Sequence, residues 1–232
     1  MRKIVILTLF KEMFDAFLKS NAIQKAIDLK LIQVDIVDIR DFSTDKHKRV
    51  DFKPYGGGRG MIISCKPLSK AIEYVKEKNQ GINFKVLYMS PRGKCLCYNT
   101  SYEMSKVQDN YIIICGHYEG IDERIIEMYN VEEISIGDYV LTGGELAAQV
   151  LIDSITRLMP GVLSDGSLDF ESHTNNLLEY PQYTKPEIFN NMSVPEVLLS
   201  GNHQKINEYR NNESIRITKK YRPEFLDSSN KK

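Results

Sequence analysis

The feature that most constrains the fold is a pattern that occurs three times between residues 84 and 144. In each case a short apolar run leads directly into a loop that contains glycine. Short apolar runs bounded in this way predict buried β-strands. The runs are residues 84–89, 111–115 and 133–136, and the loops are residues 90–93, 116–120 and 137–144.

Helical patterns follow the last two loops, at residues 123–128 and 145–158. Strands that alternate with helices predict an α/β fold with a mostly parallel sheet and helices on both faces. In such a sheet ligands bind at the carboxyl ends of the strands, where glycine lets a ligand approach the backbone closely. We therefore predict that the three loops converge on one pocket.

The first eighty residues add further elements to this sheet. Residues 3–9 and 32–38 are apolar or alternating runs that predict strands. Residues 11–30 and 67–78 have apolar side chains at helical spacing, which predicts one or two helices in the first range and one in the second.

A change of composition after residue 160 predicts a boundary between domains. Pro160 and Gly161 end the last helical pattern, and the polar stretch that follows has few apolar residues. We predict an α/β domain at residues 1–163, a flexible linker at residues 164–176, and a small, mainly helical domain at residues 177–232.

Composition excludes several other classes of protein. Apolar residues make up 42% of the chain and charged residues 27%, which is ordinary for a soluble globular protein. No stretch approaches the ~18 uninterrupted apolar residues of a membrane span, so no membrane partner is expected. The apolar run at residues 4–10 is too short for a signal peptide, and four cysteines without such a signal predict a reducing, cytoplasmic location.

Two common kinds of site are poorly supported. The sequence has neither a Walker A motif nor G-x-G-x-x-G, which argues against P-loop nucleotides and nicotinamide cofactors. Single residues separate Cys95 from Cys97 and Cys115 from His117, a spacing too tight for the usual zinc ligands. We interpret the cysteines as buried, unreactive thiols, and His117 as more typical of a structural histidine than of a ligand.

Charge is balanced overall, with 31 basic and 31 acidic side chains, but it is unevenly distributed. An acidic block at residues 119–145 lies between basic blocks at residues 46–66 and 205–222. This order suits a protein that holds a cation centrally and a polyanion at its margins. Ordinary solvated faces are the alternative interpretation of each block taken alone.

Seven short motifs follow one another along nearly the whole chain, up to about Leu226. They are Tyr55-Gly-Gly-Gly-Arg-Gly-Met61, Ser90-Pro-Arg-Gly93, Cys115-Gly-His-Tyr-Glu-Gly-Ile-Asp122, Ser135-Ile-Gly-Asp-Tyr-Val-Leu-Thr-Gly-Gly-Glu145, Pro160-Gly-Val-Leu163, Tyr180-Pro-Gln-Tyr-Thr-Lys-Pro186 and Val194-Pro-Glu-Val-Leu-Leu-Ser-Gly-Asn-His203. Each is weak alone, but in this order they closely resemble bacterial tRNA (guanine-N1)-methyltransferases, the TrmD family.

The resemblance implies more than the local patterns do. It implies a deep trefoil knot in the C-terminal part of the α/β domain (the SPOUT class) and a homodimer. It implies S-adenosylmethionine as methyl donor and tRNA, rather than DNA, as the nucleic acid, with methylation at N1 of guanosine 37, next to the anticodon. Mg²⁺ is also implied, although no ligand cluster for a metal is visible in the sequence.

The motifs also imply which residues bind the cofactor. Backbone groups of the three loops would bond the adenine and ribose, and Glu119 would meet the cationic methionine end. By motif position the residues are Tyr88, Met89, Ser90, Pro91, Gly116, Tyr118, Glu119, Gly120, Ser135, Ile136, Gly137, Tyr139, Leu141, Gly143 and Gly144.

Methylation at N1 of guanine requires a base at N1 and a positive donor at O6. By motif position Arg157 is the O6 donor, although an arginine at a helix C-terminus can simply complement the helix dipole. The family has Asp, then Ser, six residues before a Leu-Leu pair, whereas this chain has Glu171 and then Ser172. We expect Glu171 to be the base, with Asp169 as the competing candidate.

For the RNA, the resemblance implies contacts to a flipped-out guanine and to the phosphate backbone. The basic stretch at residues 46–59, together with Lys219, Lys220 and Arg222, would hold phosphates. His203 either contacts RNA or caps the helix that it begins. Two alternatives to the methyltransferase are an RNA-binding protein inactivated by its glutamate and a methyltransferase for another RNA base.

Overall fold

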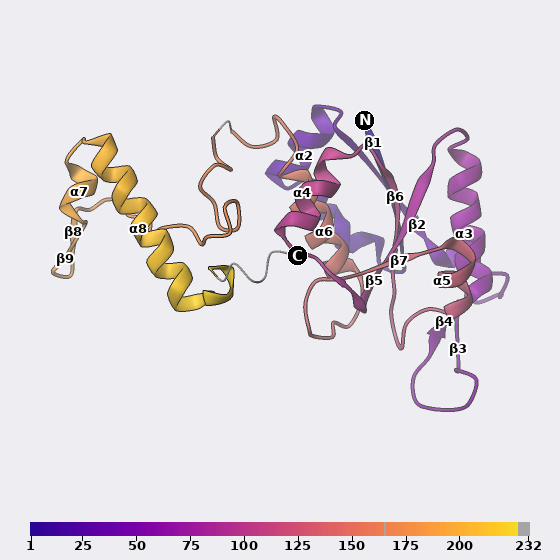
Figure 1. Cartoon of the computed structure of the whole chain (residues 1–232). Helices are drawn as coiled ribbons and strands as arrows, with labels where there is room; N and C mark the ends of the chain where they lie inside the picture. Colours follow the sequence, from indigo (N-terminus) through magenta and orange to yellow (C-terminus); the bar gives the residue numbers. More distant parts are fainter. Residues whose placement is uncertain (165, 227–232) are drawn as a thin grey trace. The chain divides into compact units, whose positions relative to one another are not determined.

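A parallel sheet with strand order β2-β1-β6-β5-β7 organises residues 1–163 in the computed structural model, which describes residues 1–164 and 166–226 (Figure 1). All of its neighbouring strands are parallel, as the alternation of strands and helices predicts. Its strands are β1 (Arg2–Thr8), β2 (Ile32–Asp38), β5 (Phe84–Cys95), β6 (Asn110–Cys115) and β7 (Glu132–Ser135).

Helices cover both faces of this sheet, which confirms the predicted α/β class (Figure 1). One face packs against α2 (Asn21–Asp28), α4 (Tyr98–Lys106) and α6 (Glu145–Thr156), and the other against α3 (Cys65–Lys78) and α5 (Glu123–Tyr129). Alternate residues of each strand enter different cores because strand side chains point to opposite faces. In β1, for example, Ile4 and Ile6 belong to one buried cluster and Val5 and Leu7 to the other.

Several short elements differ from the sequence prediction. Residues 11–30 contain a 3₁₀ helix (Lys11–Phe14), α1 (Asp15–Leu18) and α2, with extended backbone at Ser20. A second 3₁₀ helix spans Ile39–Phe42. A small hairpin of β3 (Asp51–Phe52) and β4 (Ile62–Ile63) carries the glycine-rich loop and was not predicted.

Helix α4 was also missed by the sequence analysis. Ser101 is its only buried residue, so it has no apolar stripe from which a helix could be predicted. Its C-terminus is held instead by the buried guanidinium of Arg2, which donates hydrogen bonds to the carbonyl oxygens of Met104, at 2.6 Å, and Val107. A side chain from the first strand therefore satisfies the end of a distant helix.

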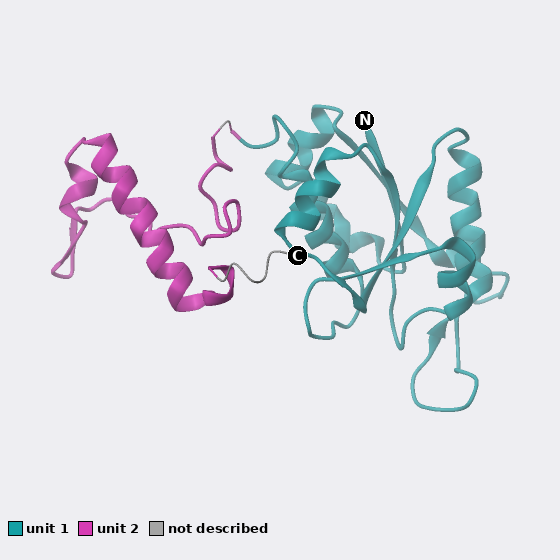
Figure 2. Ribbon diagram, in the orientation of Figure 1, with its two compact units in different colours: residues 1–163 teal, residues 164–232 magenta. Residues whose placement is uncertain are grey.

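Residues 164–232 form a second compact unit (Figure 2). Its long helix, α8 (His203–Tyr221), is followed by a 3₁₀ helix, and Ile206, Ser214 and Thr218 of α8 are buried. Among the residues that the structure describes, its elements are a hairpin of β8 (Ile188–Phe189) and β9 (Met192–Ser193), α7 (Glu196–Leu199), α8 (His203–Tyr221) and the 3₁₀ helix Pro223–Phe225.

The stretch predicted as a linker consists of hydrogen-bonded turns between residues 166 and 176. The amide of His173 donates to the carbonyl of Leu177 at 2.7 Å, and the amide of Glu179 donates to the hydroxyl of Ser172 at 3.0 Å. The flexibility of this stretch stays a prediction. In the described part of the chain, no helix has both the length and the apolar character needed to cross a membrane.

Candidate functional site

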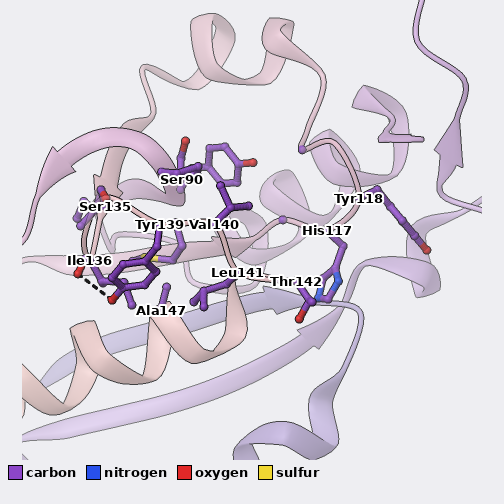
Figure 3. A pocket seen from close by; sticks show the side chains of 18 of the residues that line it. Ser90, His117, Tyr118, Ser135, Ile136, Tyr139, Val140, Leu141, Thr142 and Ala147 are labelled. Atoms are coloured by element: carbon purple, nitrogen blue, oxygen red, sulfur yellow. Dashed lines mark hydrogen bonds between the residues drawn. The ribbon is translucent and has the colours of Figure 1, made fainter. Parts of the chain in front are cut away.

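A cavity of about 210 Å³ lies at the carboxyl ends of β5, β6 and β7, where their three loops meet (Figure 3). Because these strands are neighbours in a parallel sheet, the loops leave from the same edge. Every residue that the motifs indicate for the cofactor lines this cavity. Five further lining residues were missed, of which all but Ala147 lie beside a selected residue in the sequence, namely His117, Ile134, Val140, Thr142 and Ala147.

The first loop is a bulge in β5. Met89 and Lys94 both pair with Ile134 of β7, so the residues between them are pushed out of the sheet toward the cavity. Gly93 makes this possible, because a Cβ atom there would lie 2.4 Å from the carbonyl carbon of Glu133. The glycine of this motif is therefore required by close packing of two strands.

The second loop follows β6 and closes over Tyr88. A Cβ atom on Gly116 would lie 2.7 Å from the ring of Tyr88, so only glycine leaves room for this aromatic wall. Burial raises the pKa of the Tyr88 phenol to about 12. Tyr118 has a left-handed backbone with φ of 62°, and its side chain is 53% exposed at the edge of the cavity.

The third loop folds back onto the second. The Tyr139 hydroxyl donates to the carbonyl of Ile136 at 3.1 Å (Figure 3), and the amide of Gly144 donates to the carbonyl of Gly116 at 2.9 Å. A Cβ atom on Gly144 would lie 2.8 Å from the backbone of Cys115. The two loops are therefore in direct backbone contact on one side of the cavity.

A buried carboxylate fastens these loops together. Glu145 is 1% exposed, accepts a hydrogen bond from the Thr8 hydroxyl at 2.6 Å, and lies 2.6 Å from Nε2 of His117. The His117 ring also packs against Phe10, with ring centroids 4.7 Å apart. Burial, and then the charge of Glu145, raise the pKa of the neighbouring Cys115 thiol. His117 thus has the structural contacts that the sequence analysis favoured for it.

Glu119 connects the cavity to the glycine-rich loop between β3 and β4. Its amide donates to the carbonyl of Met61 at 2.9 Å, and Ile63 pairs with Ile121 in a parallel bridge. A Cβ atom on Gly60 would lie 2.3 Å from Oε1 of Glu119. The basic, glycine-rich loop is consequently anchored to a loop that lines the cavity.

The two predicted catalytic residues lie in different units of the chain. Arg157 is the C-terminal capping residue of α6 in the first unit. Glu171 lies in the second unit and lines a separate cavity there, whereas Asp169 does not line that cavity. Both Arg157 and Glu171 already have interactions with other groups of the chain. Neither lines the cavity formed by the three loops.

The cysteine prediction is wrong for two of the four thiols. Cys95 is the last residue of β5 and Cys97 is the N-cap of α4, and both are exposed, whereas only Cys115 is fully buried. All four are free thiols. Within residues 1–164 and 166–226, no group of three His, Cys, Asp or Glu side chains is arranged to hold a metal ion.

The helix N-terminus at His203 is capped by its neighbour. The side chain of Asn202 accepts a hydrogen bond from the amide of Lys205 at 3.1 Å. Capping therefore does not require His203, and an RNA contact stays the alternative for this residue.

Comparison with known proteins identifies the family of the chain. The model of the family described as tRNA (Guanine-1)-methyltransferase TrmD matches residues 2–228. A tRNA (guanine-N(1)-)-methyltransferase of Clostridioides difficile (strain 630) is 49% identical over 228 residues, which cover 98% of each chain. Its counterpart in Ruminiclostridium cellulolyticum is 52% identical over 226 residues, covering 97% of this chain and 96% of that protein. The chain therefore belongs to the TrmD family of tRNA (guanine-1)-methyltransferases.

Proposed function

We propose that this protein transfers a methyl group from S-adenosylmethionine to N1 of guanosine 37 in tRNA. The observation that carries the proposal is the convergence on one cavity of all the residues that the family motifs indicate for the cofactor. The relatives that are about half identical carry the name of this activity. The lining of the cavity and the names of the relatives thus support the same function.

The cavity fits the chemistry of the donor. Gly116 and Gly144 let the loops pack closely at the wall of the cavity, and other backbone groups of the lining loops would bond an adenine edge and a ribose. Ile136 and Leu141 offer apolar surface for the ring, and Glu119 offers a carboxylate for the cationic end. When bound, S-adenosylmethionine would supply an electrophilic methyl group on a positively charged sulfur.

The catalytic roles follow from the charge that moves during the reaction. Glu171 would accept the proton of guanine N1 as N1 gains the methyl group, and Arg157 would donate to O6, where negative charge builds up. A carboxylate in water is a weak base, and removal of water by bound RNA would strengthen it. Asp169, in a turn two residues before Glu171, is the alternative base.

Exposed basic groups support a role for two regions in holding the tRNA backbone. Lys53, Arg59 and the fully exposed Tyr55 lie in the anchored loop between β3 and β4. Lys219 and Lys220 are exposed in the last turn of α8. Arg222 follows them and packs on Phe225, with its guanidinium 4.1 Å from the ring centroid. We propose that these groups bind phosphates, with His203 as a further RNA contact.

The proposal includes a trefoil knot in the first unit, a homodimer, a mainly helical second domain and a cytoplasmic location. The bridge between Gly143 and His117 brings together the loops after β6 and β7, although β5 separates these strands in the sheet, and this contact supports the proposed knot. Leu146 and Val150 are 49% and 46% exposed on α6, an apolar face that a second copy would cover. The proposal also includes Mg²⁺, for which the described residues offer no group of three His, Cys, Asp or Glu ligands.

The test is methyl transfer from labelled S-adenosylmethionine to two tRNA transcripts, one with guanosine and one with adenosine at position 37. We expect label only in the first transcript, at N1 of the guanine. Tight tRNA binding without transfer would favour the RNA-binding protein, and transfer to both transcripts would favour a different target base.

A further inference from the structure

A second cavity, of about 230 Å³, lies within the second unit. It is formed between the turns around residue 171 and one face of α8. Its volume is similar to the 210 Å³ of the cavity formed by the three loops. The lining residues are Phe170, Glu171, Asn175, Leu177, Leu178, Tyr180, Asn207, Arg210, Asn211 and Ser214.

Aromatic and apolar side chains provide walls for a flat ring. Phe170 is 63% exposed although it is a large apolar side chain beside the cavity. Tyr180 is fixed by Arg210, whose guanidinium carbon lies 4.9 Å from the centre of the tyrosine ring. Aromatic faces of this kind stack with unpaired bases of RNA.

Polar groups of α8 complete the lining of the cavity. Asn207 and Asn211 are four residues apart, so their side chains lie on the same face of the helix. Nε of Arg210 is buried, and in the described part of the chain it has no hydrogen-bond partner. A buried donor without a partner is rare in proteins, and a carbonyl oxygen of a ligand in this cavity would satisfy it.

Glu171 adds an acceptor to these donors. Guanine presents N–H groups at N1 and N2, which suit a carboxylate, next to the O6 carbonyl, which suits a guanidinium or an amide. Adenine has a hydrogen-bond acceptor at N1 and an amino donor in place of O6. Its N1 would therefore face the carboxylate, which is also an acceptor, and its amino group would face another donor. The lining therefore matches guanine better than adenine.

We propose that this cavity in the second unit binds a guanine base of the RNA substrate and that Asn207, Arg210 and Asn211 select it. The inference rests on the proposed function in one respect, which is that the RNA bound by the protein is tRNA. The base is either the target guanine or another guanine of the same loop, because both present the same edge.

The test measures binding of full-length protein to tRNA transcripts that carry guanosine or adenosine at one loop position at a time. The ratio of the two dissociation constants at each position gives the preference for guanine. We expect Asn211→Ala to lower that preference about tenfold at one position, the size of one lost base contact. Asn212→Ala is the matched control, since Asn212 is also exposed on α8 but does not line the cavity.

The tRNA position at which the preference for guanine falls identifies the bound base. A fall at position 37 indicates the target guanine, and a fall at a neighbouring position indicates another guanine of the loop. Asn207→Ala should affect the same position, and unchanged thermal unfolding of each variant excludes misfolding. Unchanged preferences at every position in both variants, or equal weakening for all transcripts, would overturn the proposal. Methyl transfer by the unaltered protein is measured separately, so failure of the proposed function is seen independently of these ratios.

Discussion

The carboxylate of Glu145 lies 2.6 Å from Nε2 of His117 and joins the start of α6 to the loop after β6. The hydroxyl of Thr8, at the end of β1, donates to the other carboxylate oxygen, so Glu145 connects three elements of the fold. Glu145 is buried, so each of these contacts replaces hydration that the carboxylate has lost. The two loops that carry most of the cavity wall are consequently positioned by one acidic side chain.

Replacement of Glu145 by alanine should therefore affect both stability and cofactor binding. The change leaves His117 and Thr8 without their buried partner, and we expect a loss of about 3 kcal/mol in the free energy of unfolding. Affinity for S-adenosylmethionine should fall at least about tenfold, about 1.4 kcal/mol. Urea unfolding and calorimetric titration measure the two effects. Asp153→Ala, at an exposed position of the same helix, should change neither.

Gly144 provides a test of the close approach between the second and third loops. In Gly144→Ala the new Cβ atom would lie 2.8 Å from the Cα atom of Cys115, a backbone atom that cannot move aside alone. We expect a loss of about 1–3 kcal/mol in stability from overpacking, with cofactor affinity reduced at least about tenfold.

Gly81→Ala is the control for backbone effects. Gly81 has φ of +83° and open space around it, so alanine should cost only about 1–2 kcal/mol of stability through strain. Its cofactor affinity should equal that of the unaltered protein. Equal affinities in Gly81→Ala and Gly144→Ala would contradict a role for close loop contact in forming the cavity.

The strands and the cavity could be predicted from sequence because both depend on local patterns. Apolar runs such as residues 111–115 must be buried, and glycine at a strand end is visible in a single sequence. The partner of His117 could not be predicted, because Glu145 is distant along the chain and only the fold brings it close. The same holds for Gly60 and Glu119, whose contact depends on a hairpin of very short strands.

Helix α4 shows a different limit of sequence reasoning. Its stability depends on Arg2, which lies 102 residues before Met104 in the sequence and caps the carbonyls of Met104 and Val107. Arg2→Met should remove these charged hydrogen bonds and lower the free energy of unfolding by about 2 kcal/mol. Hydrogen exchange should rise first in residues 98–106. Exposed Arg49 offers a control, and similar exchange in Arg49→Met and Arg2→Met would argue against the capping role.

The buried phenol of Tyr88 predicts a dependence of stability on alkaline pH. Burial raises its pKa from 10 to about 12, so the unfolded chain loses this proton at a lower pH than the folded protein does. Stability should therefore be fully present below about pH 10 and fall by up to about 2.7 kcal/mol as the pH rises to about 12. Tyr88→Phe should lack this component. The difference between the two unfolding curves from pH 9 to 12 measures it, and parallel curves would contradict the assignment.

Substitution of the carboxylates in the turn before Tyr180 separates the two candidate bases. Glu171→Gln keeps the size of the side chain but cannot accept the N1 proton, so kcat should fall by about 10²–10⁴-fold. Glu171→Asp carries the residue that the family pattern has at this position and should retain most of the activity. Asp169→Asn should leave kcat within about threefold, since Asp169 does not line the cavity that contains Glu171. Loss of activity in Asp169→Asn with retention of activity in Glu171→Gln would assign the base to Asp169 instead. The second cavity would then select guanine without contributing the base.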